Sequence, residues 1–266
     1  MNPTIREIIE AVENVAKPRW QEDFDNTGWQ ILLPDVIDEP CTGVMLCVDA
    51  TTEVLQEAAL KGCNLLLTHH PLLFRGIKRI DSANRVGRCI IDAIRWNISV
   101  YSCHTAVDSA PCGVSQVLAK LIGLQNIEIL APARDENVGI GIVGDLPQPL
   151  NFNELVNLVK RTYHSPVARC SGIPSADALI TRIAIGGGAC SDLIPEAIEK
   201  GAQVMVTSDV KHNMFIDYSH AIAIIDLGHY ETEDCTKDIF YNIITEKFPN
   251  FAPYYSVSEK NPITYL

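Results

Sequence analysis

The segment 63-CNLLLTHHP-71 joins an apolar run to two adjacent histidines and a proline. The apolar run is typical of a buried strand, and Pro71 ends it because proline lacks the backbone donor that a central strand needs. Adjacent side chains on a strand point to opposite faces, so His69 and His70 can share a site only where the strand ends. Sites in α/β proteins form at the carboxyl ends of strands. The segment therefore predicts such a site. The alternative, for an isolated pair, is that one histidine lies on the surface and the other is hydrogen-bonded within the fold, with no site.

The composition indicates a folded protein with one large or two ordinary domains: 266 residues, 47% hydrophobic and 20% charged. No apolar run reaches ~18 residues and the N-terminus does not resemble a signal peptide, so we expect no membrane partner and a cytoplasmic location. Nine cysteines without a CxxC pair fit free thiols in a reducing compartment. The net charge of −12 opposes non-specific nucleic-acid binding.

The residues around the histidines predict a β-α-β unit. A buried strand over 44–48 leads to a helix that starts near Thr51, ends at Gly62 and returns through the strand before His69. Upstream, Thr4 and Glu7 form a capping box that begins a helix ending near Pro18. The polar, aromatic loop 20–30 is either a turn that packs Trp29 on the core or a loop near the site.

The chain repeats this pattern. Displaced by 139 positions, residues 44–68 align with 183–207 without a gap, with six identities in 25 positions. Displaced by 125, residues 100–104 align with 225–229, so each half ends a strand with a histidine and has an acid four residues later. On a helical turn those two side chains share a face. We therefore predict an internal duplication that gives two similar α/β lobes, with sheets flanked by helices.

The predicted lobes are residues 1–125 and residues 126–233. The segment 234–266 is a candidate completion of the first lobe.

Five residues just past the strand ends share the chemistry of metal ligands: His69, His70, Asp108, His229 and Glu233. Imidazole nitrogen suits transition metals, whereas Mg and Ca prefer oxygen. Carboxylates can bridge two ions, and such a pair supports hydrolysis. His104 lies nearby, and we expect it to handle protons as a catalytic residue. The sequence thus predicts one or two divalent ions, and hydrolysis as the reaction class.

The segment 75–95 is basic in an acidic chain, with six arginine or lysine residues against two aspartates (+6 −2 = +4). Such a segment can hold phosphate groups, or it can be the solvated face of an ordinary helix. Both alternatives stay open at this point.

Three motifs resemble those of the NIF-three-like family, whose members are also called GTP cyclohydrolase 1 type 2 homologs. They are LLLTHHPLLF (65–74), VYSCHTAVD (100–108) and DLGHYETE (226–233). The loop EDFDNTGWQ (22–30) and the segment TSDVKHN (207–213) resemble further parts of that family.

The resemblance implies a two-lobed α/β protein with a dinuclear metal centre between the lobes, in a toroidal homohexamer. It also implies that the five residues above ligate two divalent transition metal ions per chain, of Zn, Fe, Mn or Ni. The spacing between His104 and the second copy implies the short form without an inserted domain.

The resulting function is a metal-dependent hydrolase of a nucleotide or phosphate-containing small molecule, in keeping with the GTP cyclohydrolase name of the family. The alternative is a metal-binding regulatory, scaffold or chaperone protein without catalysis.

Overall fold

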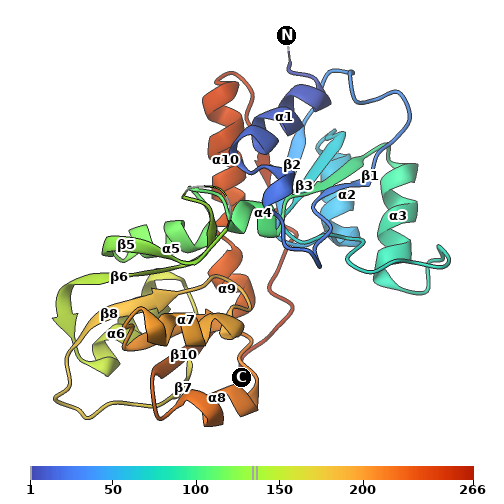
Figure 1. Ribbon diagram of the computed structural model, residues 1–266. Helices are drawn as coiled ribbons and strands as arrows, with labels where there is room; N and C mark the ends of the chain where they lie inside the picture. The colour runs from blue at the N-terminus through green and yellow to red at the C-terminus, as the bar shows by residue number, and fades with distance from the viewer. Residues whose placement is uncertain (1, 134, 136) are drawn as a thin grey trace. The chain divides into compact units, whose positions relative to one another are not determined.

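The computed structural model describes residues 2–133, 135 and 137–266. These residues form a mixed α/β fold with two sheets flanked by helices (Figure 1). The chain divides into two compact units, each built from more than one stretch of sequence. The first unit comprises Met1–Val107 and Thr236–Pro262, and the second comprises Asp108–Cys235 and Ile263–Leu266.

The sheet of the first unit has the strand order β1-β4-β3-β2-β11. Its strands are β1 (Gly28–Ile31), β2 (Val44–Cys47), β3 (Leu65–Thr68), β4 (Ser99–Ser102) and β11 (Tyr254–Tyr255). Strands β2, β3 and β4 run parallel, and every residue of all three is buried. Their carboxyl ends therefore meet at one edge of the sheet, and these three central strands are covered on both faces.

Helices cover this sheet. They are α1 (Ile5–Val15), α2 (Thr52–Leu60), α3 (Arg85–Arg95) and α10 (Thr236–Lys247), with the short η1 (Pro18–Trp20) and α4 (Thr105–Asp108). The predicted capping box is present, because Thr4 accepts from the backbone of Glu7 while the Glu7 carboxylate accepts from that of Thr4. Thr51 caps α2, and Gly62 follows that helix with φ of 70°. The predicted β-α-β unit around the histidines is confirmed.

Two buried glutamates fasten the C-terminal segment to the first unit. Glu57 on α2 accepts hydrogen bonds from the Ser256 hydroxyl and from the backbone of Val257 and Ser258, at 2.8–3.0 Å. Glu259 accepts from the backbone of Val48 and Asp49, just past the end of β2, at 2.7 and 2.8 Å. The residues that end β2 are thus held by a segment more than 200 positions away.

The sheet of the second unit has the order β5-β6-β8-β9-β10-β7. Its strands are β5 (Gln125–Pro132), β6 (Gly139–Leu150), β7 (Arg169–Ser171), β8 (Ile180–Ile185), β9 (Val204–Ser208) and β10 (Ala223–Leu227). The helices are α5 (Val114–Leu121), α6 (Phe152–Thr162), η2 (Ser191–Leu193), α7 (Ile194–Glu199), α8 (His212–Tyr218) and α9 (His229–Glu233). Strands β8, β9 and β10 run parallel in the same relative order as β2, β3 and β4. The internal duplication inferred from the sequence stays a prediction.

The division between the units differs from the predicted one at residue 125. Helix α5 contacts β6 and β8 of the second sheet, and the Tyr163 hydroxyl on that side donates to the Leu118 carbonyl at 2.9 Å. Packing therefore assigns residues 108–125 to the second unit. After β10 the chain forms two helices, α9 and α10, and the units divide between them at Cys235 and Thr236. Within the described residues, no helix is both long and apolar enough to cross a bilayer.

Candidate metal centre

Three histidines gather at the carboxyl ends of β3 and β4. His69 and His70 follow β3 directly, and His104 follows β4. Because the two strands are parallel neighbours that end in register at Thr68 and Ser102, the three rings come together. One ring nitrogen from each lies within 4.8 Å of the others, a spacing that could hold a metal ion.

Backbone hydrogen bonds fix the turn that brings His69 and His70 to the same side. The His69 amide donates to Cys47 at 3.1 Å, and the His70 amide donates to Val48 at 2.9 Å. The hydroxyls of Thr68 and Ser102 both lie within hydrogen-bond distance of the His70 carbonyl oxygen, at 2.8 and 3.1 Å. These hydrogen bonds hold the end of the strand independently of any contact that the two imidazole rings make.

Each ring in this cluster has a hydrogen-bond acceptor at Nδ1. For His69 it is the Cys103 carbonyl at 3.2 Å, for His70 the Asp49 carboxylate at 3.2 Å, and for His104 the Asp25 carboxylate at 2.7 Å. An acceptor at Nδ1 keeps the proton on that nitrogen and turns Nε2 toward a ligand. This is the arrangement that metal-ligating histidines usually show.

Asp25 is the most firmly held of the acids behind the rings. Its side chain is fully buried. It accepts from the Asn26 amide at 2.7 Å, the Thr27 hydroxyl at 3.0 Å and the Thr105 amide at 3.0 Å, besides His104. Burial alone would raise the pKa of this carboxyl, but the hydrogen bonds and the charge of His104 outweigh it and hold the pKa well below its ordinary value. Asp25 is therefore a fixed anion that orients His104.

The second unit carries a histidine and a glutamate on one helical turn. His229 Nε2 lies 2.8 Å from a Glu233 carboxylate oxygen, four residues along α9. His229 Nδ1 lies 2.9 Å from the carboxylate of Asp209, which directly follows β9. Asp209 has φ of 52°, a left-handed conformation that aspartate tolerates better than most residues. The predicted convergence of His229 and Glu233 at positions i and i+4 is present.

A glycine turn after β8 makes room for this pair. Gly188 has φ of 66°, and a Cβ built on it would lie 2.0 Å from Glu233 Oε1. Its amide donates to the Thr232 hydroxyl at 3.0 Å. Both the conformation and the close approach of the backbone to Glu233 therefore require glycine here.

Asp108 is the last residue of α4 and the first of the second unit. Burial raises the pKa of the Cys190 thiol well above the ordinary value, and the charges of Asp108, Asp192 and Glu233 raise it further. The second unit therefore contains two of the predicted carboxylates, Asp108 and Glu233, and one imidazole, His229.

The predicted residues thus fall into a first-unit cluster of His69, His70 and His104, and a second-unit cluster of Asp108, His229 and Glu233. His104 hydrogen bonds to Asp25, although the motif had suggested Asp108 as its acid partner. The sequence interpretation assigned no supporting role to Asp25, Asp49 or Gly188. A usable signal existed for Asp49, because it directly follows a predicted strand.

The donor chemistry of both clusters fits divalent transition metals. Neutral imidazoles suit Zn, Fe or Ni, and carboxylates also suit Mn. Calcium and magnesium sites are built from oxygen ligands, whereas the first cluster offers imidazole nitrogens. The residues present therefore fit a transition-metal centre.

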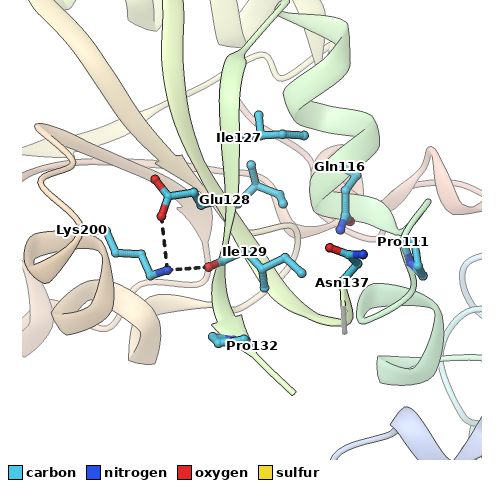
Figure 2. Close-up of a pocket in the computed structure, with 9 residues that line it drawn as sticks. Pro111, Gln116, Ile127, Glu128, Ile129, Pro132, Asn137 and Lys200 are labelled. Atoms are coloured by element: carbon cyan, nitrogen blue, oxygen red, sulfur yellow. Dashed lines mark hydrogen bonds and ion pairs between the residues drawn. The ribbon is translucent and has the colours of Figure 1, made fainter. Parts of the chain in front are cut away.

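A pocket of about 440 Å³ lies in the second unit (Figure 2). Its walls include Ile127, Ile129 and Ile142. The Lys200 ammonium donates to the Ile129 carbonyl at 2.9 Å and lies 3.9 Å from Glu128, so its charge is already partnered within the protein. The pocket contains no residue of either donor cluster among its lining residues.

A protein-family model matches residues 3–262, and its description is Duf34/NIF3 (NGG1p interacting factor 3). The chain belongs to this family. It is 32% identical over 236 residues to the GTP cyclohydrolase 1 type 2 homolog of Clostridium acetobutylicum, covering 88% of this chain and 86% of the relative. It is 27% identical over 251 residues to the protein NIF3 homolog of Schizosaccharomyces pombe, covering 91% and 89%. The family resemblance found in the sequence is confirmed.

Solved structures share the fold over the whole chain. The hypothetical protein SA1388 of Staphylococcus aureus has a TM-score of 0.88 at 26% identity, with 100% of both chains covered. Reduced HcgD from Methanocaldococcus jannaschii has a TM-score of 0.79 at 25% identity, covering 96% of this chain and 97% of that one. The mixed α/β architecture is therefore that of the family.

Proposed function

We propose that the protein binds two divalent transition metal ions per chain and hydrolyses a nucleotide or another small molecule that carries phosphate. The metal ligands are His69 and His70 from the first unit, with Asp108, His229 and Glu233 from the second. The observation that carries the proposal is the acceptor at Nδ1 of His69, His70 and His229, which favours the tautomer whose lone pair for a metal ion is on Nε2.

The combination of donors supports a pair of ions. A neutral imidazole gives one lone pair to one ion, whereas a carboxylate can bridge two ions about 3.5–4 Å apart. The first cluster is rich in imidazole and the second in carboxylate, so ligands from both units make up the donor set of a dinuclear centre. Bound divalent ions supply Lewis-acid chemistry, the polarisation of a substrate oxygen.

His104 is the proposed catalytic residue. Its Nδ1 donates to the buried Asp25, so Nε2 can take a proton from an attacking water and return it to a leaving group. Asp25 stabilises the imidazolium that forms in between. The names of the clostridial and other relatives make GTP the first substrate to test.

The test is turnover of a nucleotide panel by metal-loaded protein, with metal content measured on the same samples. Asp108→Ala and Glu233→Ala should lose both metal and turnover. His104→Gln should keep the metal while the rate falls about 10²- to 10⁴-fold, the range typical of a lost general base. Metal-loaded wild type that hydrolyses no member of a broad panel would contradict the proposal. Metal-dependent capture of a partner protein without turnover would favour a scaffold role.

We also propose that the chain assembles as a toroidal homohexamer, as the family resemblance implies. Sedimentation equilibrium should give six times the chain mass of 29.3 kDa. A monomer across the micromolar range would contradict this assembly.

A further inference from the structure

Two exposed phenylalanines lie beside the histidine cluster of the first unit. The side chains of Phe24 and Phe74 are 65% and 45% exposed, and their ring centroids are 6.4 Å apart. The Phe74 ring in turn lies 6.1 Å from the ring of His104. Single exposed apolar residues are common on proteins, but a pair of aromatic rings at the edge of a candidate catalytic residue indicates a binding surface.

Hydrogen bonds hold the loops that carry the two rings together. The Asn26 side-chain amide donates to the Leu73 carbonyl at 3.0 Å, and the Leu73 amide donates to the Gln30 side chain at 2.9 Å. Gln30 also donates to the Asn26 carbonyl at 2.7 Å, which closes the network. The two loops that carry Phe24 and Phe74 are thus held together before a ligand arrives, which lowers the entropic cost of binding.

The basic segment after Phe74 divides into engaged and unengaged cations. Four of its arginines already contact the protein: Arg79 with Asp81, Arg85 with the Ala50 carbonyl, Arg88 with the Ser82 carbonyl and Arg95 with Asp92. Arg75 and Lys78 are exposed and have no hydrogen bond or ion pair with any residue that the structure describes. The helical part of the segment is therefore a structural face, and Arg75 and Lys78 in the loop remain to bind an anion.

The rings of Phe24 and Phe74 meet edge to face, at an interplanar angle of 61°. We infer that the planar ring of a phosphorylated heteroaromatic compound stacks on one of them and contacts the edge of the other, and that Arg75 and Lys78 hold its phosphate. The inference rests on the proposed function and names its substrate class. Aromatic side chains stack on any nucleobase, because every base has a π-face. Guanidinium and ammonium groups are the usual partners of phosphate oxygens. The phosphorylated ring would lie next to His104, where the proposed chemistry occurs.

The test is equilibrium binding of GTP and ATP to the full-length, metal-loaded chain, with guanosine and inorganic triphosphate as probes of each half. The nucleotides should bind at least about tenfold more tightly than either half. Phe24→Ala/Phe74→Ala should bring nucleotide affinity down to about that of triphosphate, and Arg75→Ala/Lys78→Ala to about that of guanosine. A base stacked on aromatic rings accounts for a loss of about tenfold or more.

Matched controls come from equally exposed residues elsewhere. Ile173→Ala/Ile216→Ala removes apolar side chains that are 64% and 63% exposed. Lys120→Ala/Arg161→Ala removes two exposed cations that, like Arg75 and Lys78, have no partner among the described residues. Both controls should leave nucleotide affinity unchanged within about twofold.

The inference would be overturned if wild type bound no nucleotide, or if both site variants bound nucleotide with unchanged affinity. It would also be overturned if Phe24→Ala/Phe74→Ala dissociated an oligomer, because the two rings would then belong to a contact between copies of the chain. Metal content of the same samples separates this from the proposed function. Nucleotide binding that depends on these four residues, in protein that retains no metal or shows no turnover, would support the binding surface while contradicting the hydrolase.

Discussion

The two units place chemically active side chains just past their parallel strands, but they support them differently. In the first unit the candidate functional groups are imidazoles, and carboxylates hydrogen bond to their Nδ1 atoms: Asp25 to His104 and Asp49 to His70. In the second unit the carboxylate of Glu233 stands in front beside His229, and a glycine turn gives it room. The first cluster therefore depends on the buried Asp25, whereas the second has the exposed Asp209 behind its histidine and depends on backbone clearance beside Glu233.

The largest effect should come from filling the space beside Glu233. Gly188→Ala and the control Gly201→Ala both put a side chain on a residue with positive φ, at 66° and 73°. That conformation costs about 1–2 kcal/mol in either case. At Gly188 the new Cβ also meets Glu233 Oε1 at 2.0 Å, whereas at Gly201 nothing lies within 4 Å. We expect urea unfolding to show a total loss of about 2–5 kcal/mol for Gly188→Ala, of which about 1–3 kcal/mol is in excess of the loss in Gly201→Ala.

Equal losses of unfolding free energy in the two glycine variants would show that Glu233 moves aside freely. Clearance would then not be what positions the second cluster.

The next effect compares the acids that support the rings. Asp25→Ala leaves the buried donors of Thr105 and His104 without their acceptor, so we expect a loss of about 2–4 kcal/mol in unfolding free energy. Asp209→Asn keeps a side chain that tolerates φ of 52°, and it should cost less than about 1 kcal/mol because this side chain is 58% exposed and the contact is screened. Chemical denaturation followed by circular dichroism measures both. Similar losses at the two positions would remove the contrast drawn here between the units.

A smaller effect tests how the first unit depends on its distant C-terminal segment. The hydrogen bonds that Glu57 accepts from residues 256–258 outweigh burial and lower its pKa below the ordinary value. A depressed carboxyl pKa stabilises the folded state above the pKa of the unfolded chain, and this stabilisation is lost as the pH falls through the folded pKa. The free energy of unfolding of wild type should exceed that of Glu57→Gln by about 1–2 kcal/mol at pH 7, and this difference should shrink below about pH 5.

The exposed Glu246→Gln is the matched control and should follow wild type at every pH. A difference between wild type and Glu57→Gln that stays constant from pH 7 to pH 3 would show that the ionised carboxylate is not what fastens the segment.

Local patterns in the sequence were sufficient to predict much of the fold and the candidate ligands in each cluster. The apolar run before His69 predicted β3, the Thr4–Glu7 pair predicted α1, and the His229 to Glu233 spacing predicted their contact. Each of these depends on residues within one strand or one turn of helix. That range is where periodicity and capping carry information.

The pairing of each supporting residue with its histidine could not be predicted in this way, because the two partners are distant in sequence. Asp25 meets His104 across 79 positions, and Asp49 meets His70 across 21. The boundary at residue 107 likewise follows from the packing of α5 against β6 and β8, which no local pattern specifies. The pairing of Phe24 with Phe74 depends on two loops whose contact only the folded chain shows.

Elemental analysis of untagged protein purified without chelator tests the central claim most directly. Wild type should hold about two Zn, Fe, Mn or Ni ions per chain, in line with a dinuclear centre. His69→Ala/Glu233→Ala, which removes one donor from each unit, should lose them while its circular dichroism spectrum stays that of wild type. Wild type that contains no metal and takes up none from an equimolar mixture of these ions would contradict the account.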